Sequence, residues 1–190
     1  MIRDLVLANR SYRRFAESEP IPESTLRGLV DLARCTPSAA NLQPLRYVLS
    51  CTPERNDLVF STLSWAGYLP DWPGPVEGER PAAYIVILTD TEVSRNPGCD
   101  HGIAAQTICL GATEKGYGCC MFGSIDRDAL RAHLRIPERY QILLVIAMGR
   151  PVEKVVLEDV GPDGSIKYYR DSDQVHHVPK RKLEDVILPL

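Results

Sequence analysis

Hydrophobic and polar positions alternate along the chain with spacings that predict both helices and strands. The clearest helical segment is 23–34, where apolar residues recur every three or four positions and share one face: Leu26, Leu29, Val30 and Ala33. The same periodicity predicts further helices over 2–9, 56–68 and 100–115. Gly116 and Gly118 would end the last of these, and Asp126 is placed to cap a short helix that follows.

Runs of branched and aromatic residues predict the strands, at 45–51, 83–89 and 140–148, with a short strand or turn at 119–123. The 83–89 run is apolar enough for a strand buried on both faces. After Pro151 the chain alternates short charged and apolar pieces, none long enough to form a core face of its own. We therefore expect one α+β domain. Its core would be 1–151, and 152–190 would be a C-terminal arm lying across this subunit or a partner.

The composition is that of an ordinary folded domain, with 190 residues, 44% hydrophobic and 25% charged. The net charge of −3 leaves no basic excess with which to bind nucleic acid in general. The longest apolar run, 142–148, is far shorter than the roughly 20 residues that a membrane span needs. The first residues lack the basic and then apolar order of a secretory signal. We expect a cytoplasmic protein with neither a nucleic-acid nor a membrane partner.

The sequence lacks the commoner motifs of side-chain catalysis. It has no Gly-x-Gly-x-x-Gly turn between strand and helix, no phosphate-binding loop with Lys, no His-Glu-x-x-His and no nucleophile elbow. The six cysteines and four histidines lack paired metal-ligand spacing, and the adjacent His176 and His177 would face opposite sides of a strand. We therefore expect no metal, mostly buried cysteines and no catalytic side chain, which leaves the chemistry to a cofactor.

The first candidate binding motif is a basic cluster near the N-terminus. The first 15 residues hold four arginines against one acid, Asp4. The cluster follows a predicted helix and consists of Arg10, Ser11, Arg13 and Arg14. Guanidinium groups bind phosphate through paired hydrogen bonds, so a phosphate monoester is one interpretation. A solvated basic loop explains these residues equally well.

The second candidate motif is Pro37-Ser38-Ala39-Ala40-Asn41-Leu42-Gln43-Pro44. Its prolines stiffen the ends, its small residues permit close backbone approach, and its two amide side chains each offer a donor and an acceptor. That mixture suits the pyrimidine edge of a flavin ring. Taken by itself, the segment is better explained as an ordinary connection between a helix and a strand.

At this spacing, the two motifs together resemble the nitroreductase family of FMN-dependent oxidoreductases. The likeness continues in the same order at 78–81, 100–106, 114–123 and 147–151, and so covers nearly the whole chain. The segment 178–184 is similar to the basic stretch that closes over the FMN phosphate in that family. The resemblance implies an α+β sandwich with a mostly antiparallel central sheet flanked by helices. It also implies an obligate homodimer with FMN at the subunit interface and the C-terminal arm swapped onto the partner.

The same resemblance implies roles for individual residues. The FMN phosphate and ribityl chain would be held by Arg10, Ser11 and Arg13, with Lys180 or Arg181 completing the phosphate site. The ring would be lined, in part from the second subunit, by Pro37, Ser38, Ala39, Asn41 and Gln43. The loop that covers the ring near its reactive nitrogen would be 121–124, with Met121, Phe122 and Gly123. Many members have Arg where this chain has Asn9, and Arg14 would restore that charge.

The implied function is that of an FMN enzyme which takes hydride from NADH or NADPH and reduces a small nitroaromatic or quinone acceptor by a ping-pong cycle. The flavin would carry the chemistry, so the resemblance implies no catalytic side chain. One alternative is an enzyme of the same fold with different flavin chemistry, such as a dehalogenase or an enoate or azoline oxidoreductase. Another is a non-catalytic flavin-binding protein.

Overall fold

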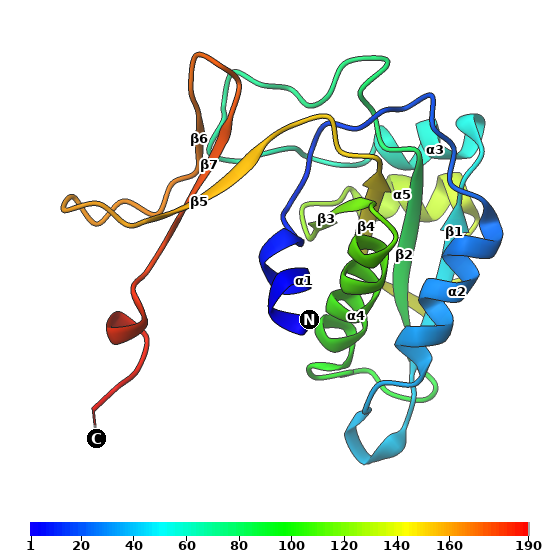
Figure 1. The fold of residues 1–190 in the computed structure, drawn as a ribbon. Coiled ribbons are helices and arrows are strands. Elements are labelled where there is room, and N and C mark those ends of the chain that lie inside the picture. Colours follow the sequence, from blue (N-terminus) through cyan, green and yellow to red (C-terminus); the bar gives the residue numbers. More distant parts are fainter. Residues whose placement is uncertain (190) are drawn as a thin grey trace.

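The computed structural model describes residues 1–189, and Leu190, the last residue of the predicted arm, lies outside the described residues. Its centre is a four-stranded antiparallel sheet with the order β1-β2-β4-β3 (Figure 1). The strands are β1 (Leu45–Ser50), β2 (Ala83–Asp90), β3 (Gly118–Phe122) and β4 (Tyr140–Gly149). This architecture confirms the predicted α+β class with a mostly antiparallel sheet.

Helices cover both faces of this sheet. One face is covered by α2 (Glu23–Arg34) and α4 (Asp100–Glu114), and the other by α3 (Pro53–Phe60) and α5 (Arg127–Leu134). The short helix α1 (Ile2–Ala8) lies against α4. Within residues 1–189, no helix has the length and apolar character that a membrane crossing requires.

Strand β2 is buried along its whole length, as its apolar sequence predicts. Because successive side chains of a strand point to opposite faces, Ile85 and Ile87 pack toward α2 and α4, whereas Tyr84 and Val86 pack toward α3 and α5. Each large apolar side chain buried in this way contributes roughly 1.5–3 kcal/mol. This strand therefore joins two hydrophobic cores into one domain.

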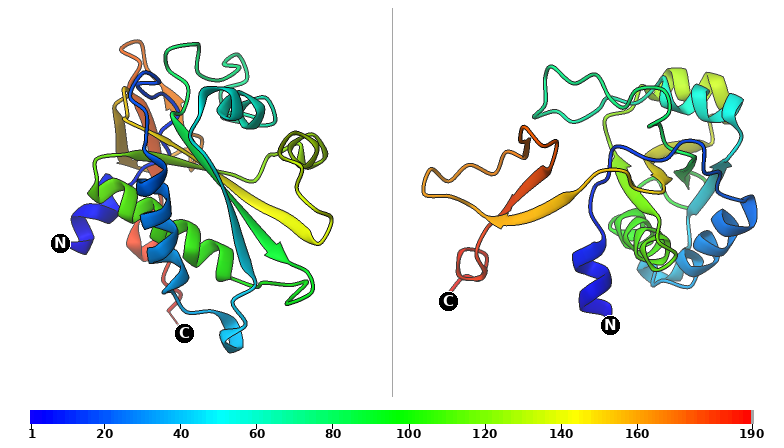
Figure 2. Two further views of the ribbon diagram at one scale, coloured as in Figure 1. Left: turned by 90° about the vertical axis from the view of Figure 1, so that its right-hand side faces the viewer. Right: turned by 45° about the horizontal axis from the view of Figure 1, so that its top comes forward.

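The arm forms a second, three-stranded sheet that the sequence analysis did not predict. Its strands are β5 (Val155–Asp159), β6 (Tyr169–Arg170) and β7 (His176–Lys180), in the order β5-β7-β6, with β5 and β7 parallel. Figures 1 and 2 show this sheet beside the helical body, and the chain beyond it extends away from that body. That last segment contains a short 3₁₀ turn, Leu183–Asp185, and exposes Leu183, Val186, Ile187 and Leu188.

One predicted helix was wrong in its limits. The helix expected over 56–68 is α3, which begins at Pro53, where the ring fixes a helical φ, and ends at Phe60. The chain then turns so that Leu63 pairs with Ile125, and Ala66 takes a left-handed φ of 38° that a helix cannot contain. The predicted cap at Asp126 is confirmed, since its carboxylate accepts the Ala129 N–H at 3.0 Å.

Candidate functional site

A cavity of about 380 Å³ lies where the N-terminal loop, α4, β3 and the arm meet. These four segments line it with Asn9, Arg10, Ser11 and Arg13; Gln106 and Cys109; Cys119 and Met121; and Tyr168, His176, Val178 and Lys180. Three of these lining residues are cations and none carries a carboxylate. The cavity therefore suits a ligand with negative charge.

Close packing against the sheet fixes the N-terminal loop. Ser11 forms a bridge with Cys119, and the Cys119 carbonyl oxygen accepts the Tyr12 N–H at 3.0 Å. Three residues after Tyr12, Phe15 is fully buried over Gly149. A Cβ on Gly149 would come within 2.8 Å of the Phe15 side chain, so only glycine lets the loop lie this close. The same contact keeps Arg10 and Arg13 beside the cavity.

Arg14 lies outside this cavity. Its Nε and Nη2 donate to Glu79 at 2.6 and 2.5 Å, and this pairing holds the pKa of Glu79 below its ordinary value. The structure thus places Arg14 as an anchor between the N-terminal loop and the segment before β2. It does not place Arg14 with Arg10 and Arg13, where it would compensate for Asn9.

Arg13 is nearly buried and is held by residues of the arm. Its Nη1 lies 3.0 Å from His176 Nε2 and 3.2 Å from the Ser11 carbonyl oxygen. The Tyr168 ring packs against the guanidinium, with its centroid 4.7 Å away. The backbone N–H of Arg13 donates to Glu153, at the start of the arm. The arm thus completes one wall of the cavity.

The two adjacent histidines do face opposite sides of β7, as the sequence predicts. His176 is 1% exposed and lines the cavity. Burial, followed by the positive charge of Arg13, lowers the pKa of His176 to about 4. His177 lies between Asp171 and Glu158, at 3.0 and 3.1 Å, and the hydrogen bond with Asp171 raises its pKa. One histidine therefore belongs to the cavity and the other to the sheet of the arm.

Of the predicted ring-binding residues, Pro37, Ser38 and Gln43 line a different cavity, of about 200 Å³, at the N-terminal end of α4. There the Ser38 hydroxyl donates to Asp100 at 2.5 Å, and the same carboxylate accepts the Ala39 N–H at 3.1 Å. Ala39 and Asn41 line neither cavity. Within one chain, the structure does not bring this loop to the cationic cavity.

The backbone of this loop is held in an unusual shape. Ala40, Asn41 and Gln43 have left-handed φ angles of 50°, 55° and 52°, which side chains with a Cβ seldom adopt. Such backbone is kept only where the surrounding contacts impose it, and it is common at ligand sites. The loop therefore remains a candidate for ligand contact.

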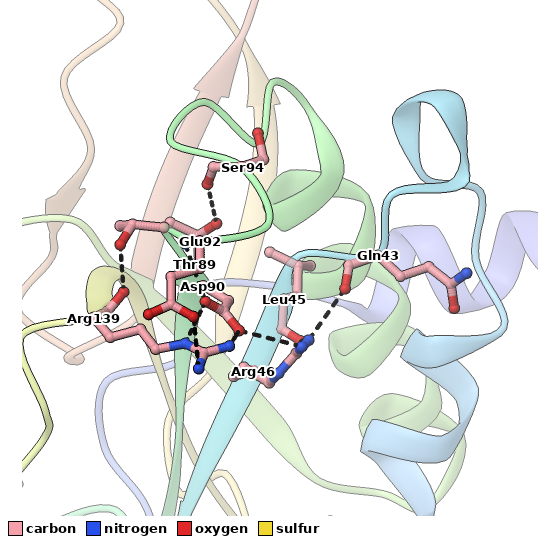
Figure 3. A network of polar contacts seen from close by, with 9 residues as sticks. Gln43, Leu45, Arg46, Thr89, Asp90, Glu92, Ser94 and Arg139 are labelled. Atoms are coloured by element: carbon pink, nitrogen blue, oxygen red, sulfur yellow. Dashed lines mark hydrogen bonds and ion pairs between the residues drawn. The ribbon is translucent and has the colours of Figure 1, made fainter.

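A buried carboxylate supports the end of the same loop (Figure 3). Asp90 is fully buried and accepts hydrogen bonds from Arg139 at 2.7 and 2.6 Å, which lower its pKa. Arg46 lies 3.4 Å from Asp90 and donates to the Gln43 carbonyl oxygen at 3.1 Å. The Asp90 backbone N–H also donates to Pro44 at 2.9 Å. This network connects the loop to β1, β2 and the turn before β4.

The remaining predicted residues divide between the cationic cavity and other surroundings. Met121 and Lys180 line it. Phe122 is buried on the opposite face of β3, where its ring lies 4.6 Å from that of Trp65. Gly123 and Arg181 are exposed and line neither this cavity nor the one near Ser38.

The cysteines beside the cavity are buried thiols. Cys119 packs in the core under α2 and α4, and Cys120 in the core on the other face. A hydrogen bond with Cys109 and burial raise the pKa of Cys119, and burial raises that of Cys120 to about 11. Protonated thiols are poor nucleophiles and poor metal ligands. In the part of the chain described here, no group of His, Cys, Asp and Glu is arranged to hold a metal ion.

Sequence reasoning missed Tyr168 and His176, the two residues of the arm that contact the Arg13 side chain. The alternation of strand side chains already separated His176 from His177, but nothing local indicates that Arg13, 163 positions away, is the partner of His176. Two buried donors of the cavity, Arg10 Nε and His176 Nδ1, have no partner within residues 1–189. Buried polar atoms are nearly always hydrogen-bonded, so these atoms are available to a ligand oxygen.

Comparison with known proteins agrees with this architecture. The model of the nitroreductase family matches residues 6–68 and 78–150. A protein of Methanothermobacter thermautotrophicus, named "Putative NADH dehydrogenase/NAD(P)H nitroreductase", is 25% identical over 166 residues, which are 84% of this chain and 82% of that protein.

Two solved structures show the same fold. The first is a nitroreductase-type protein of Desulfovibrio desulfuricans in complex with FMN, with a TM-score of 0.71 and 22% identity, covering 100% of this chain and 96% of that one. The second is the enone reductase CLA-ER of gut-bacterial fatty acid metabolism. It has a TM-score of 0.68 and 18% identity, and the match covers 80% of this chain and 89% of that one. Because the family model matches well over half of the sequence, the chain belongs to the nitroreductase family.

Proposed function

We propose that the protein is an FMN-dependent oxidoreductase that takes hydride from NADH or NADPH and reduces a small organic acceptor of the nitroaromatic or quinone type. The relatives' names support an NAD(P)H-dependent oxidoreductase. The FMN complex of the Desulfovibrio protein supports the choice of cofactor.

One observation carries the proposal, namely a cavity with Arg10, Arg13 and Lys180 in its walls and no carboxylate. FMN is a phosphate monoester attached to a planar ring, so it needs cations at one end and apolar or thiol contacts along the rest. Met121, Val178 and Cys109 offer those contacts in the same cavity. The residues present therefore fit the cofactor.

The chemistry that bound FMN supplies is two-electron transfer between the nicotinamide and the acceptor. The chain's own residues bind and orient. Arg10, Ser11, Arg13 and Lys180 would hold the phosphate and ribityl groups. In this proposal the protein supplies no general acid or base, and the histidine of the cavity, His176, stays neutral because burial lowers its pKa to about 4.

The proposal includes a homodimer. The loop with Ser38 and Asn41 has a strained backbone and lies away from the cationic cavity of its own chain, so a second subunit would bring it to the ring. The segment after β7 exposes Leu183, Val186, Ile187 and Leu188 at 58–77%, which is apolar surface that a partner would cover.

The direct test is the absorbance spectrum of the purified protein, before and after incubation with FMN. Visible flavin bands, followed by steady-state oxidation of NADH or NADPH with menadione or a nitrofuran, would support the proposal. A colourless protein that does not bind added FMN would contradict it.

A second function is favoured by one observation, the likeness to the enone reductase. An enzyme of that kind would reduce an activated carbon–carbon double bond and leave menadione largely untouched. A non-catalytic flavin protein would bind FMN and turn over neither acceptor. The same assay, run with an α,β-unsaturated ketone as a third acceptor, separates the three cases.

A further inference from the structure

The buried guanidinium of Arg13 has a neutral partner where proteins usually provide a carboxylate. Arg13 is 9% exposed and His176 is 1% exposed, and their side-chain nitrogens lie 3.0 Å apart. A carboxylate of the arm, Glu153, contacts Arg13 only through the backbone. It accepts the backbone N–H of Arg13 on one oxygen and pairs with Arg170 at 3.0 Å on the other. Glu153 therefore does not neutralise the Arg13 side chain.

The contact fixes where the proton of His176 lies. A guanidinium can only donate, so Nε2 of His176 accepts and the proton of the neutral ring is on Nδ1. Burial, and then the charges of Arg13, Arg170 and, from the other side of the strand, His177, lower the pKa of this ring to about 4. His176 therefore stays uncharged at neutral pH and keeps its Nδ1–H.

Tyr168 holds the pair from the side. The centroid of its ring lies 4.7 Å from Cζ of Arg13 and 5.2 Å from the centroid of the His176 ring. Its hydroxyl accepts the Tyr68 backbone N–H at 3.3 Å, so the ring is itself held by the connection between α3 and β2. The guanidinium is thus fixed in direction before any ligand enters.

We infer that His176 is a positioning residue that aims Arg13 at an electron-rich ligand oxygen while leaving the positive charge of Arg13 uncompensated. The unpartnered Nδ1–H of His176, in the wall of the same cavity, is a second donor for that ligand. A carboxylate at this position would hold Arg13 equally well but would cancel the charge that the ligand needs. The inference rests on the proposed function in taking FMN as the ligand.

Three substitutions separate positioning from charge. His176→Gln retains an uncharged acceptor for Arg13, His176→Leu removes it, and His176→Glu replaces it with a negative one. FMN affinity would be measured by quenching of flavin fluorescence. We expect it to change by less than about threefold in His176→Gln. In His176→Leu and His176→Glu we expect it to fall about 10- to 100-fold. For Glu, the affinity should also depend less on salt than in the wild type, because one cation is neutralised.

A matched control is His177→Gln, which changes the neighbouring residue on the face of β7 away from the cavity. It should retain wild-type FMN affinity while altering the sheet of the arm. Unfolding curves of every variant show whether each one is folded when it is titrated.

A second measurement needs no activity and no ligand. Nitrogen-15 NMR of the histidine rings should show His176 as the neutral Nδ1–H tautomer at pH 6, with its Nδ1 resonance shifting when FMN is added. A charged ring or an Nε2–H tautomer would overturn the inference. So would Leu and Glu variants that bind FMN as tightly as the wild type. If the wild type binds no FMN at all, the proposed function fails, and the tautomer alone then decides whether His176 positions Arg13.

Discussion

His177 and Asp171 are joined by a contact of 3.0 Å that ties β7 to the end of β6, on the opposite side of the strand from the cavity. Glu158 of β5 contacts the other ring nitrogen at 3.1 Å, and the Tyr169 ring is stacked on the imidazole. A single imidazole thus connects all three strands of the arm.

The two adjacent histidines should make stability depend on pH in opposite directions. The pKa of His177 is raised, so its contribution is fully present below the ordinary value near 6.5 and is lost as pH rises through the folded value. Unfolding of His177→Gln at pH 6 and pH 9 should show a stability loss that is larger at pH 6. An equal loss at both values would contradict a charged His177 in the fold.

For His176 the sign is reversed, because its folded pKa is about 4. Its contribution is present above the ordinary value near 6.5 and is lost as pH falls toward 4, by about 3 kcal/mol over that window. His176→Gln should therefore lose less stability than the wild type between pH 6.5 and pH 4.5, measured by urea unfolding. Parallel losses in both proteins would show that His176 is not buried as a neutral ring.

Neighbouring arginines should differ in what they bind. Arg13→Ala should weaken FMN binding by about 1.5–3 kcal/mol, the value of a hydrogen bond to a charged group, and should leave riboflavin, which lacks the phosphate, nearly unaffected. Arg14→Ala breaks only a partly exposed ion pair with Glu79, so it should cost about 0.5–1 kcal/mol of stability and little FMN affinity. Titration of both variants with FMN and riboflavin is the measurement. If both variants lose the same amount of FMN affinity, the assignment of Arg13, and not Arg14, to the binding site is wrong.

The glycine under Phe15 should be hard to replace. A Cβ on Gly149 meets the Phe15 side chain at 2.8 Å, so Gly149→Ala should destabilise the protein by about 1–3 kcal/mol through overpacking. Gly28→Ala is the matched control, since nothing lies within 4 Å of its Cβ and it sits inside α2. There alanine should stabilise by roughly 0.5–1 kcal/mol. Thermal unfolding of both variants measures these changes in stability. If neither substitution changes the stability, the close contact between Gly149 and Phe15 is refuted.

The buried cysteines should not take part in turnover. Because the pKa values of Cys119 and Cys120 are raised, both remain protonated at neutral pH and exchange electrons poorly. Replacing both with Ala should leave reduction of quinones by NAD(P)H largely intact while FMN stays bound. Loss of turnover in a fully loaded variant would establish a redox role.

Truncation after Pro151 should remove FMN retention and dimerisation together. The arm supplies Tyr168, His176 and Lys180 to the cavity and exposes the apolar segment that we propose a partner covers. Light scattering and the visible spectrum of the truncated chain test the two properties separately. A yellow, dimeric truncated protein would make the arm peripheral.

The core could be predicted from the sequence because its signals are local. The periodicity of Leu26 and Leu29, and the unbroken apolar run of β2, need only neighbouring residues to be recognised. The helix over 56–68 failed for a tertiary reason, since the pairing of Leu63 with Ile125 overrides a pattern that is acceptable for a helix. The second sheet was missed because β5 and β7 pair across a long connection and each is short.

The residues that line the candidate cavity could be predicted only in part, for the same physical reason. Arg10, Ser11 and Arg13 lie within four positions of one another and line the same cavity, and so does Lys180 of the basic segment. The partners of these residues are distant in sequence. Arg14 pairs with Glu79, away from the cavity, and Arg13 contacts His176. Neither pairing can be recognised from the sequence around either partner.

The cavity walls also determine when the site exists. Residues 9–13 are synthesised well before residues 168–180, and the contact of His176 with Arg13 joins the two segments. A nascent chain therefore has an N-terminal loop but no enclosed cavity until residues 168–180 have been made. Under the proposed function, FMN would therefore be enclosed only after the strands of the arm have been made and have folded onto the N-terminal loop.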